Sequence, residues 1–324
     1  MDESAELPSK TSAEKPEPTP NHVETPNTPQ PEKENLEDSE KFGIFYKSLL
    51  NEALGNGETD TTVLEGSNER TRALADSITL TAREYKHKEH LLASVKSMQG
   101  LDFMQQAFPQ NEALESADIE LQELSEGIYA VSIDTDSFSK IYNNSSQAVA
   151  IKVPDGVSFI MIRKYGEESE ATKRDKKENI PHEVNHLVWN YLKKDKIVQC
   201  DEEDPEVNKA YQMYQDELAA KLVSDGALIS YTHLQIVSPE ERARLQNDNP
   251  TIVEQIKAKQ IELNNVLEEI GSRGGSQVKK DALLLPLIRA RNFYELKQAL
   301  LNTRNIIPQV EQTTQQSNSS WDSV

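Results

Sequence analysis

The chain has 324 residues but only one cysteine, Cys200, and few aromatic residues. One cysteine excludes a disulfide framework within the chain and a cysteine-rich zinc finger, because both require several thiols at fixed spacings. Any metal site would therefore use histidine and carboxylate ligands. Hydrophobic residues make up only 36% of the chain, which predicts that part of it stays outside a packed core.

Long hydrophobic runs and an excess of basic residues are also missing. No stretch of about 18 apolar residues occurs, and the N-terminus has no basic segment followed by an apolar one. The net charge of −20 disfavours binding to phosphate backbones. We therefore expect a soluble, cytoplasmic protein that binds neither a membrane nor nucleic acid.

Composition divides the chain into five parts. Residues 1–38 are rich in proline and glutamate and residues 311–324 are polar, so both are expected to be disordered tails. We expect a helical N-terminal region at 39–117, a core that contains the strands at 118–237, and a helical C-terminal region at 238–310. The sequence contains no internal repeat.

Hydrophobic periodicity predicts the secondary structure of these parts. Helices are expected at 42–50, 68–98, 102–108, 206–224 and 252–270, with a final helix that ends near 301. Strands are expected at 119–124, 128–133, 148–153 and 157–163, and residues 227–237 are expected to be extended. A Pro-Asp-Gly turn at 154–156 separates two of these strands, which predicts an antiparallel hairpin. The charged segment 166–178 is expected to be a loop.

The most informative segment is His182-Glu183-Val184-Asn185-His186, which follows the pattern His-Glu-x-x-His. On an α-helix, residues four apart lie on one face, so the two imidazoles could bind one metal ion. Glu183 lies between them and could reach a metal-activated water. Uncharged residues flank the motif at helical spacing, which predicts a helix packed under a cleft. They are Ile180, Val184, Leu187, Val188, Tyr191 and Leu192.

A zinc ion needs a third protein ligand, and the best candidate is Glu217. A further helix is predicted there, and the two alanines of Asp216-Glu217-Leu218-Ala219-Ala220 would allow it to pack closely. Asp216 and Glu206 remain alternatives. The two segments together resemble the motifs of gluzincin-type zincin metallopeptidases, over about a third of the chain.

This resemblance implies an α+β protein with a zincin-like core, in which helical regions flank a small antiparallel or mixed sheet and the active-site helix. It implies a Zn²⁺ ion held by His182, His186 and Glu217. Glu183 would act as general base on the metal-activated water and then donate a proton to the leaving amine. The strand before the active-site helix would pair with the backbone of a protein or peptide substrate. The group that stabilises the oxyanion is left open between Tyr214, Tyr211 and His233.

Pro181 departs from the family's pattern, because it lies directly before the first ligand. Proline is tolerated in the first turn of a helix. We therefore expect the motif helix to begin near Ile180 and to end near residue 196. His182 would then lie in its first turn, with little helix before it.

The leading hypothesis is a zinc-dependent metallopeptidase. The alternative is a non-enzymatic interaction or scaffold protein with a degenerate or coincidental motif, because helical flanks, an acidic surface and disordered tails are typical of such proteins. A third hypothesis is the metal-supported hydrolysis of a non-peptide amide. The second histidine pair, His87 and His90, is interpreted as solvated. Nothing in the sequence indicates an oligomeric state.

Overall fold

The computed structural model describes residues 36–305, apart from gaps at 97, 143–145, 165–169, 225–238 and 273–276. The tail expected at 311–324 and the extended segment expected at 227–237 therefore lie outside the described residues. The other expected tail also lies outside them, except that residues 36–38 already belong to the first helix.

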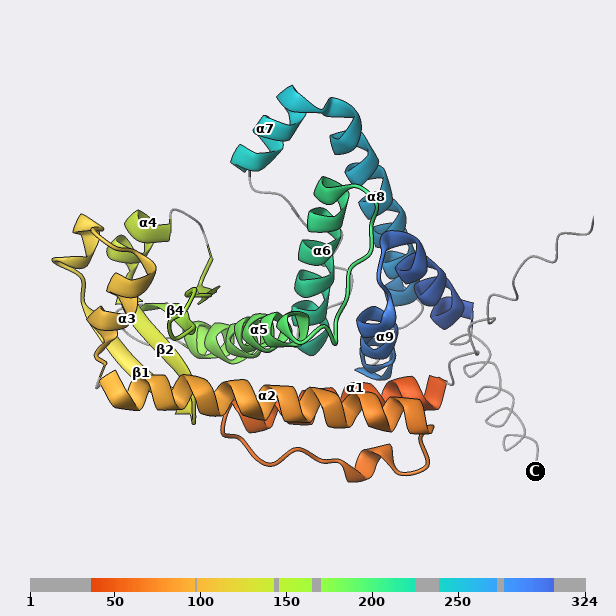
Figure 1. The fold of residues 1–324 in the computed structure, drawn as a ribbon, viewed down its shortest axis with the longest axis horizontal. Coiled ribbons are helices and arrows are strands. Elements are labelled where there is room, and N and C mark those ends of the chain that lie inside the picture. Colours follow the sequence, from red (N-terminus) through yellow and green to blue (C-terminus); the bar gives the residue numbers. More distant parts are fainter. Residues whose placement is uncertain are drawn as a thin grey trace, which may run out of the picture. The chain divides into compact units, whose positions relative to one another are not determined.

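The described residues form a mixed α+β fold, as expected, with many helices and one small sheet (Figure 1). The helices are α1 (Leu36–Ala53), α2 (Glu69–Lys96), α3 (Gly100–Ala107), α4 (Thr135–Tyr142), α5 (Glu170–Lys194), α6 (Pro205–Val223), α7 (Pro239–Asp248), α8 (Pro250–Ser272) and α9 (Gln277–Arg289). Residues 293–305 are also helical. The strands are β1 (Ile119–Ser125), β2 (Ile128–Asp134), β3 (Ala148–Ile151) and β4 (Phe159–Lys164). None of the described helices combines the length and the apolar character needed to cross a membrane.

The sheet has the strand order β1-β2-β4-β3. β1 and β2 are antiparallel, β2 and β4 are parallel, and β3 and β4 form the antiparallel pair that the turn at 154–156 predicts. β4 thus has a partner on both sides, whereas β3 lies at an edge. The expectation that the strand before the active-site helix pairs with a substrate is therefore wrong for β4, because its backbone groups are already used within the sheet.

The two faces of the sheet belong to different layers, because side chains alternate along a strand. On β4, Ile160 and Ile162 face the main core with α5, whereas Phe159 and Met161 face a smaller cluster that includes Phe103 of α3 and Phe138 of α4. The helix α4 was not expected from the sequence. It begins directly after β2, where a side-chain oxygen of Asp134 accepts a hydrogen bond from the backbone N–H of Ser137 (2.9 Å).

The helix that carries the motif begins earlier than expected. α5 starts at Glu170, so the prediction of a loop at 166–178 is wrong from residue 170 onward, and Pro181 lies inside the helix rather than in its first turn. A proline inside a helix removes one hydrogen bond and costs about 3 kcal/mol. The C-terminal half of α5 offsets this cost by burial, since Val184, Leu187 and Trp189 are almost fully buried.

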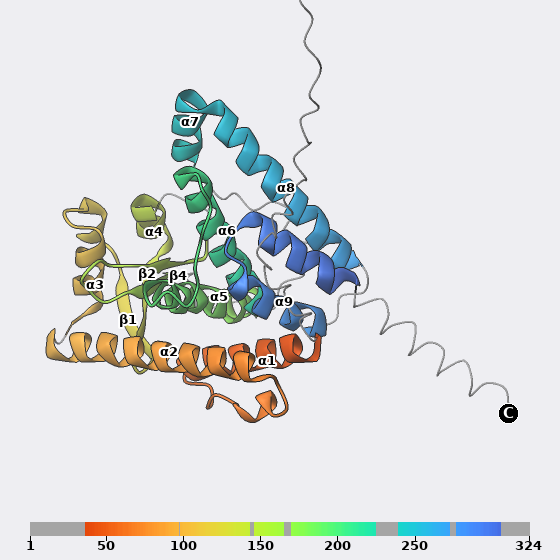
Figure 2. The same ribbon diagram turned by 45° about the vertical axis from the view of Figure 1, so that its right-hand side comes forward.

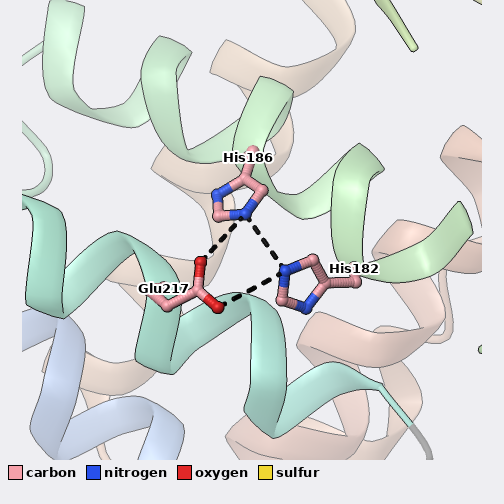
Figure 3. A group of neighbouring side chains, drawn as sticks. All are labelled: His182, His186 and Glu217. Atoms are coloured by element: carbon pink, nitrogen blue, oxygen red, sulfur yellow. Dashed lines mark hydrogen bonds and ion pairs between the residues drawn. The ribbon is translucent and has the colours of Figure 1, made fainter. Parts of the chain in front are cut away.

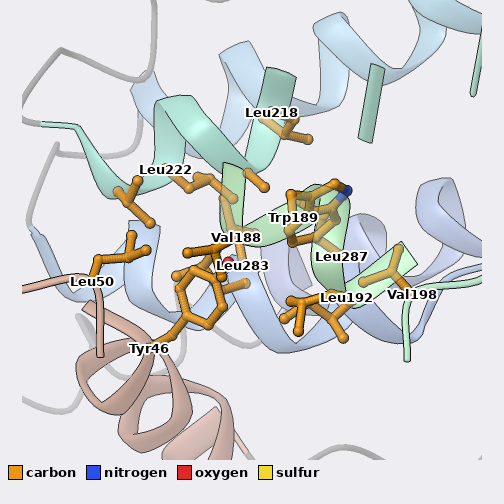
Figure 4. Close-up of a cluster of buried hydrophobic side chains, with 14 of the residues drawn as sticks. Tyr46, Leu50, Val188, Trp189, Leu192, Val198, Leu218, Leu222, Leu283 and Leu287 are labelled. Atoms are coloured by element: carbon orange, nitrogen blue, oxygen red, sulfur yellow. The ribbon is translucent and has the colours of Figure 1, made fainter. Parts of the chain in front are cut away.

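The main core forms where α5 and α6 pack with α1 and α9. Tyr46 and Leu50 of α1, Val188 and Trp189 of α5, and Leu283 of α9 meet there (Figure 4). α9 contacts both α1 and α6 (Figure 2). Its segment from Leu283 to Ile288 contains no charged residue and is buried on every side of the helix. The N-terminal helical region (39–117), the region with the strands (118–237) and the C-terminal helical region (238–310) all contribute residues to this core.

Candidate metal centre

The three expected ligands converge from two adjacent helices. His182 and His186 lie one turn apart on α5, and Glu217 lies on α6, which packs against α5 (Figure 3). The two Nε2 atoms are 3.2 Å apart. One carboxylate oxygen of Glu217 lies 3.7 Å from Nε2 of His182, and the other lies 3.5 Å from Nε2 of His186. Among the described residues, no other group of three His, Cys, Asp or Glu side chains comes together in this way.

These distances fit a tetrahedral zinc site. Zinc binds histidine nitrogen and carboxylate oxygen at about 2.0–2.2 Å, which places two ligand atoms of a tetrahedron about 3.3–3.6 Å apart. The three observed separations of 3.2, 3.5 and 3.7 Å agree with that range to about 0.1 Å. Three protein ligands also leave a fourth position for water or substrate, as in catalytic zinc sites.

Local sequence explains why Glu217 reaches this position. Asp204 caps α6, because its side chain accepts hydrogen bonds from the backbone N–H groups of Glu206 and Val207, and Pro205 occupies the first turn. Ala219 and Ala220 are fully buried, and their small side chains allow a close approach to other helices. Glu206, an alternative ligand in the sequence, lies near the start of α6 and pairs with Arg244 (3.2 Å).

Asp216, the other alternative, lies behind His186 rather than beside the three ligand atoms. Its Oδ1 atom is 2.7 Å from Nδ1 of His186. The hydrogen bond requires a proton on Nδ1, which leaves Nε2 to face His182 and Glu217.

The electrostatics of the centre favour a cation. Burial and the charge of His186 lower the pKa of His182 to about 4. Burial also disfavours a charge on His186, but Asp216 and Glu217 outweigh that effect and raise its pKa to about 10. Burial would raise the pKa of Glu217, yet the hydrogen bond with His186 and the positive charges lower it to about 2. Because a metal binds deprotonated ligand atoms, zinc would replace the proton on Nε2 of His186.

Glu183 lies on the side of α5 that faces the edge strand. Its side chain is almost buried, and one carboxylate oxygen accepts a 2.7 Å hydrogen bond from the backbone N–H of Ala150 in β3. Burial raises the pKa of Glu183, although the charge of His186 and the bond from Ala150 oppose this shift. A carboxylate with a raised pKa is better suited to exchange protons near neutral pH.

The residues proposed to stabilise an oxyanion lie elsewhere. Tyr211 and Tyr214 are fully buried, and their hydroxyl groups donate to the backbone oxygen of Ala290 (2.9 Å) and to Oδ1 of Asn264 (3.0 Å). These hydroxyl groups join α6 to its neighbours in the core, so neither tyrosine is available to a substrate. His233 lies outside the described residues.

Tyr142, at the end of α4, is a candidate that the sequence did not indicate. Burial, together with the negative charge of Glu183, raises the pKa of its phenol. The side chain nevertheless remains 38% exposed and packs edge-on against Phe138. No motif surrounds Tyr142 in the sequence.

The second histidine pair has other partners. Nδ1 of His90 lies 3.1 Å from Glu123 in β1, and Nδ1 of His87 lies 3.7 Å from Glu126. Both contacts join α2 to the β1–β2 hairpin, and a third ligand of the kind seen at Glu217 is not found beside them in the described residues.

Comparisons with protein-family models, with curated proteins and with solved structures found no match to this chain.

Proposed function

We propose that this protein is a zinc-dependent metallopeptidase with a zincin-like core. The observation that carries the proposal is the convergence of His182, His186 and Glu217, whose ligand atoms are spaced as a tetrahedral zinc site requires. These residues come from a His-Glu-x-x-His helix and a second helix, and their donor set of two histidines and one glutamate is found in catalytic zinc sites.

A bound zinc ion would act as a Lewis acid, which would polarise the scissile carbonyl and lower the pKa of a water molecule. Glu183 accepts the proton that water loses as its oxygen bonds to the carbonyl carbon. It then gives this proton to the amide nitrogen as the C–N bond breaks. Its burial and raised pKa support both roles.

The edge strand β3 is the proposed binding surface for the substrate backbone. The backbone N–H of Arg163 donates to the backbone oxygen of Gln147 (2.9 Å), so Gln147 and every second residue after it direct their backbone groups toward β4. The backbone groups of Ala148 and Ala150 therefore point to the opposite side, and the N–H of Ala150 meets Glu183 there. An extended peptide that pairs with this side of β3 would bring a peptide bond to the metal centre.

The direct test compares purified wild-type protein with Glu183→Gln on a mixture of unfolded proteins and synthetic peptides, with products identified by mass spectrometry. Glu183→Gln is expected to keep its zinc and to lose hydrolysis by at least about 100-fold, the lower range for loss of a general base. Glu203→Gln, an exposed glutamate, is the matched control and should hydrolyse like the wild type. Undiminished cleavage by Glu183→Gln would rule out the proposed mechanism.

A further inference from the structure

Asp216 connects the metal centre to the edge strand. Its carboxylate is almost buried on α6, directly before Glu217 in sequence. Oδ1 contacts Nδ1 of His186 (2.7 Å), whereas Oδ2 lies 3.2 Å from Nζ of Lys152 and 3.8 Å from Nζ of Lys193. One turn of α6 thus carries both a metal ligand and the carboxylate that orients a second ligand.

The two lysines come from different elements. Lys193 lies on α5, two turns after His186, so its contact with Asp216 stays within the packed helices. Lys152 directly follows β3, the strand whose outer side faces Glu183. The contact between Lys152 and Asp216 is therefore the one that joins the strand to the carboxylate behind His186.

The charges make this connection favourable. Oδ1 faces the imidazole of His186, and Oδ2 faces the ammonium groups of the two lysines. Hydrogen bonds between ionised partners are shorter and stronger than those between neutral partners. An orienting carboxylate fixes both the tautomer and the ring plane of a metal-binding histidine.

We infer that Asp216 is a positioning residue for His186, and that Lys152 holds Asp216 to the edge strand, so that metal binding and substrate pairing share one connection. This inference rests on the proposed metal centre. It gives Lys152 a role that no motif in the sequence indicates. It also predicts that a change at Lys152, which contacts none of the three ligands in the described contacts, weakens zinc binding.

The test measures zinc affinity by competition with a chromophoric chelator and the absorbance spectrum of the Co²⁺-substituted protein. Asp216→Asn is expected to lower zinc affinity by about 10- to 100-fold, the range for loss of an orienting partner. Lys152→Met should lower it by up to about tenfold, and Lys152→Arg should restore it. Both Asp216→Asn and Lys152→Met should alter the cobalt spectrum, because a reoriented His186 changes the coordination geometry.

Asp201→Asn, at an exposed aspartate, is the matched control and should bind zinc like the wild type. Wild-type affinity and an unchanged cobalt spectrum in Asp216→Asn would overturn the role of Asp216. If Asp216→Asn fails to fold, Lys152→Met decides, because wild-type zinc affinity in that variant contradicts the inferred connection. A wild type that binds zinc but cleaves no peptide would refute the proposed function and leave this inference standing, whereas a wild type without zinc affinity would refute both.

Discussion

The backbone N–H of Ala150 donates a 2.7 Å hydrogen bond to the carboxylate of Glu183. The proposed general base is thereby fixed to the edge strand on which a substrate is proposed to bind. Within β3, the residues on either side of Ala150 cannot make this contact, because they direct their backbone groups toward β4.

Replacing Ala150 by proline tests this contact, because proline has no N–H. Proline is tolerated on edge strands where the N–H faces away from the sheet, so the variant is expected to fold and to retain zinc. Hydrogen bonds to charged groups contribute about 1.5–3 kcal/mol, and kcat/KM for peptide hydrolysis should fall about tenfold or more. Ala150→Gly keeps the N–H and is the matched control; equal kcat/KM in the two variants would argue against the contact.

Tyr142→Phe removes the phenol whose pKa is raised by burial and by the negative charge of Glu183. If this phenol donates a hydrogen bond to the oxyanion, kcat should fall by about 10²- to 10³-fold, with zinc content unchanged. Steady-state kinetics on a cleaved peptide measure the effect. Tyr294→Phe is the control, because Tyr294 is among the most exposed aromatic residues described. A kcat within about twofold of the wild type for Tyr142→Phe would remove it from the mechanism.

At Gly43, the backbones of α1 and α9 lie close together. A Cβ atom at this position would overlap the backbone of Asp281, so Gly43→Ala should lower the free energy of unfolding by about 1–3 kcal/mol, as overpacking does. Urea unfolding followed by circular dichroism measures the change. The neighbouring Ile44 is largely exposed, and Ile44→Ala should change the stability by less than about 0.5 kcal/mol. Similar stabilities for both variants would contradict the close packing.

The ion pair between Glu52 and Arg83 is expected to make the stability of the protein depend on pH in the acid range. Hydrogen bonds from Arg83 lower the pKa of Glu52 from 4.5 to about 2. Since the folded-state pKa is lowered, the ionised pair stabilises the protein above about pH 4.5, and this contribution is lost as the pH falls toward 2. Arg83 is exposed, so the contribution is at most about 1 kcal/mol.

The measurement is urea unfolding at about pH 6 and about pH 3. Arg83→Met should lose less stability than the wild type between these two values, because it lacks the pair. Identical pH dependence of the two proteins would show that the pair contributes nothing to folding.

The sequence predicted those parts of the fold and the centre that depend on short-range patterns. Periodicity placed α2 and α6 to within two residues, and the turn at 154–156 indicated the β3–β4 pair. The spacing of His182 and His186 follows from helix geometry alone. Glu217 could be selected because its helix and its small neighbours are visible in the sequence.

Features that depend on long-range packing were not predictable in this way. The charged residues before Pro181 resemble a loop, yet α5 begins at Glu170. The strand order places β4 between two partners and β3 at the edge, and a sequence does not state such an order directly. Lys152 meets Asp216 across 64 positions of the sequence, and Glu183 meets the backbone N–H of Ala150 across 33. Such contacts result from tertiary packing. The alternation of side chains along a strand shows which residues share a face, but it does not show which other residues they will contact.

The zinc content of the dialysed protein, measured by mass spectrometry, tests whether His182, His186 and Glu217 hold a zinc ion. We expect about one zinc ion per chain in the wild type and in His87→Ala, whose histidine is exposed. We expect essentially no zinc in His182→Ala, provided that circular dichroism shows the variant to be folded. Equal zinc content in His182→Ala and the wild type, or a wild type without zinc, would contradict the proposed zinc site.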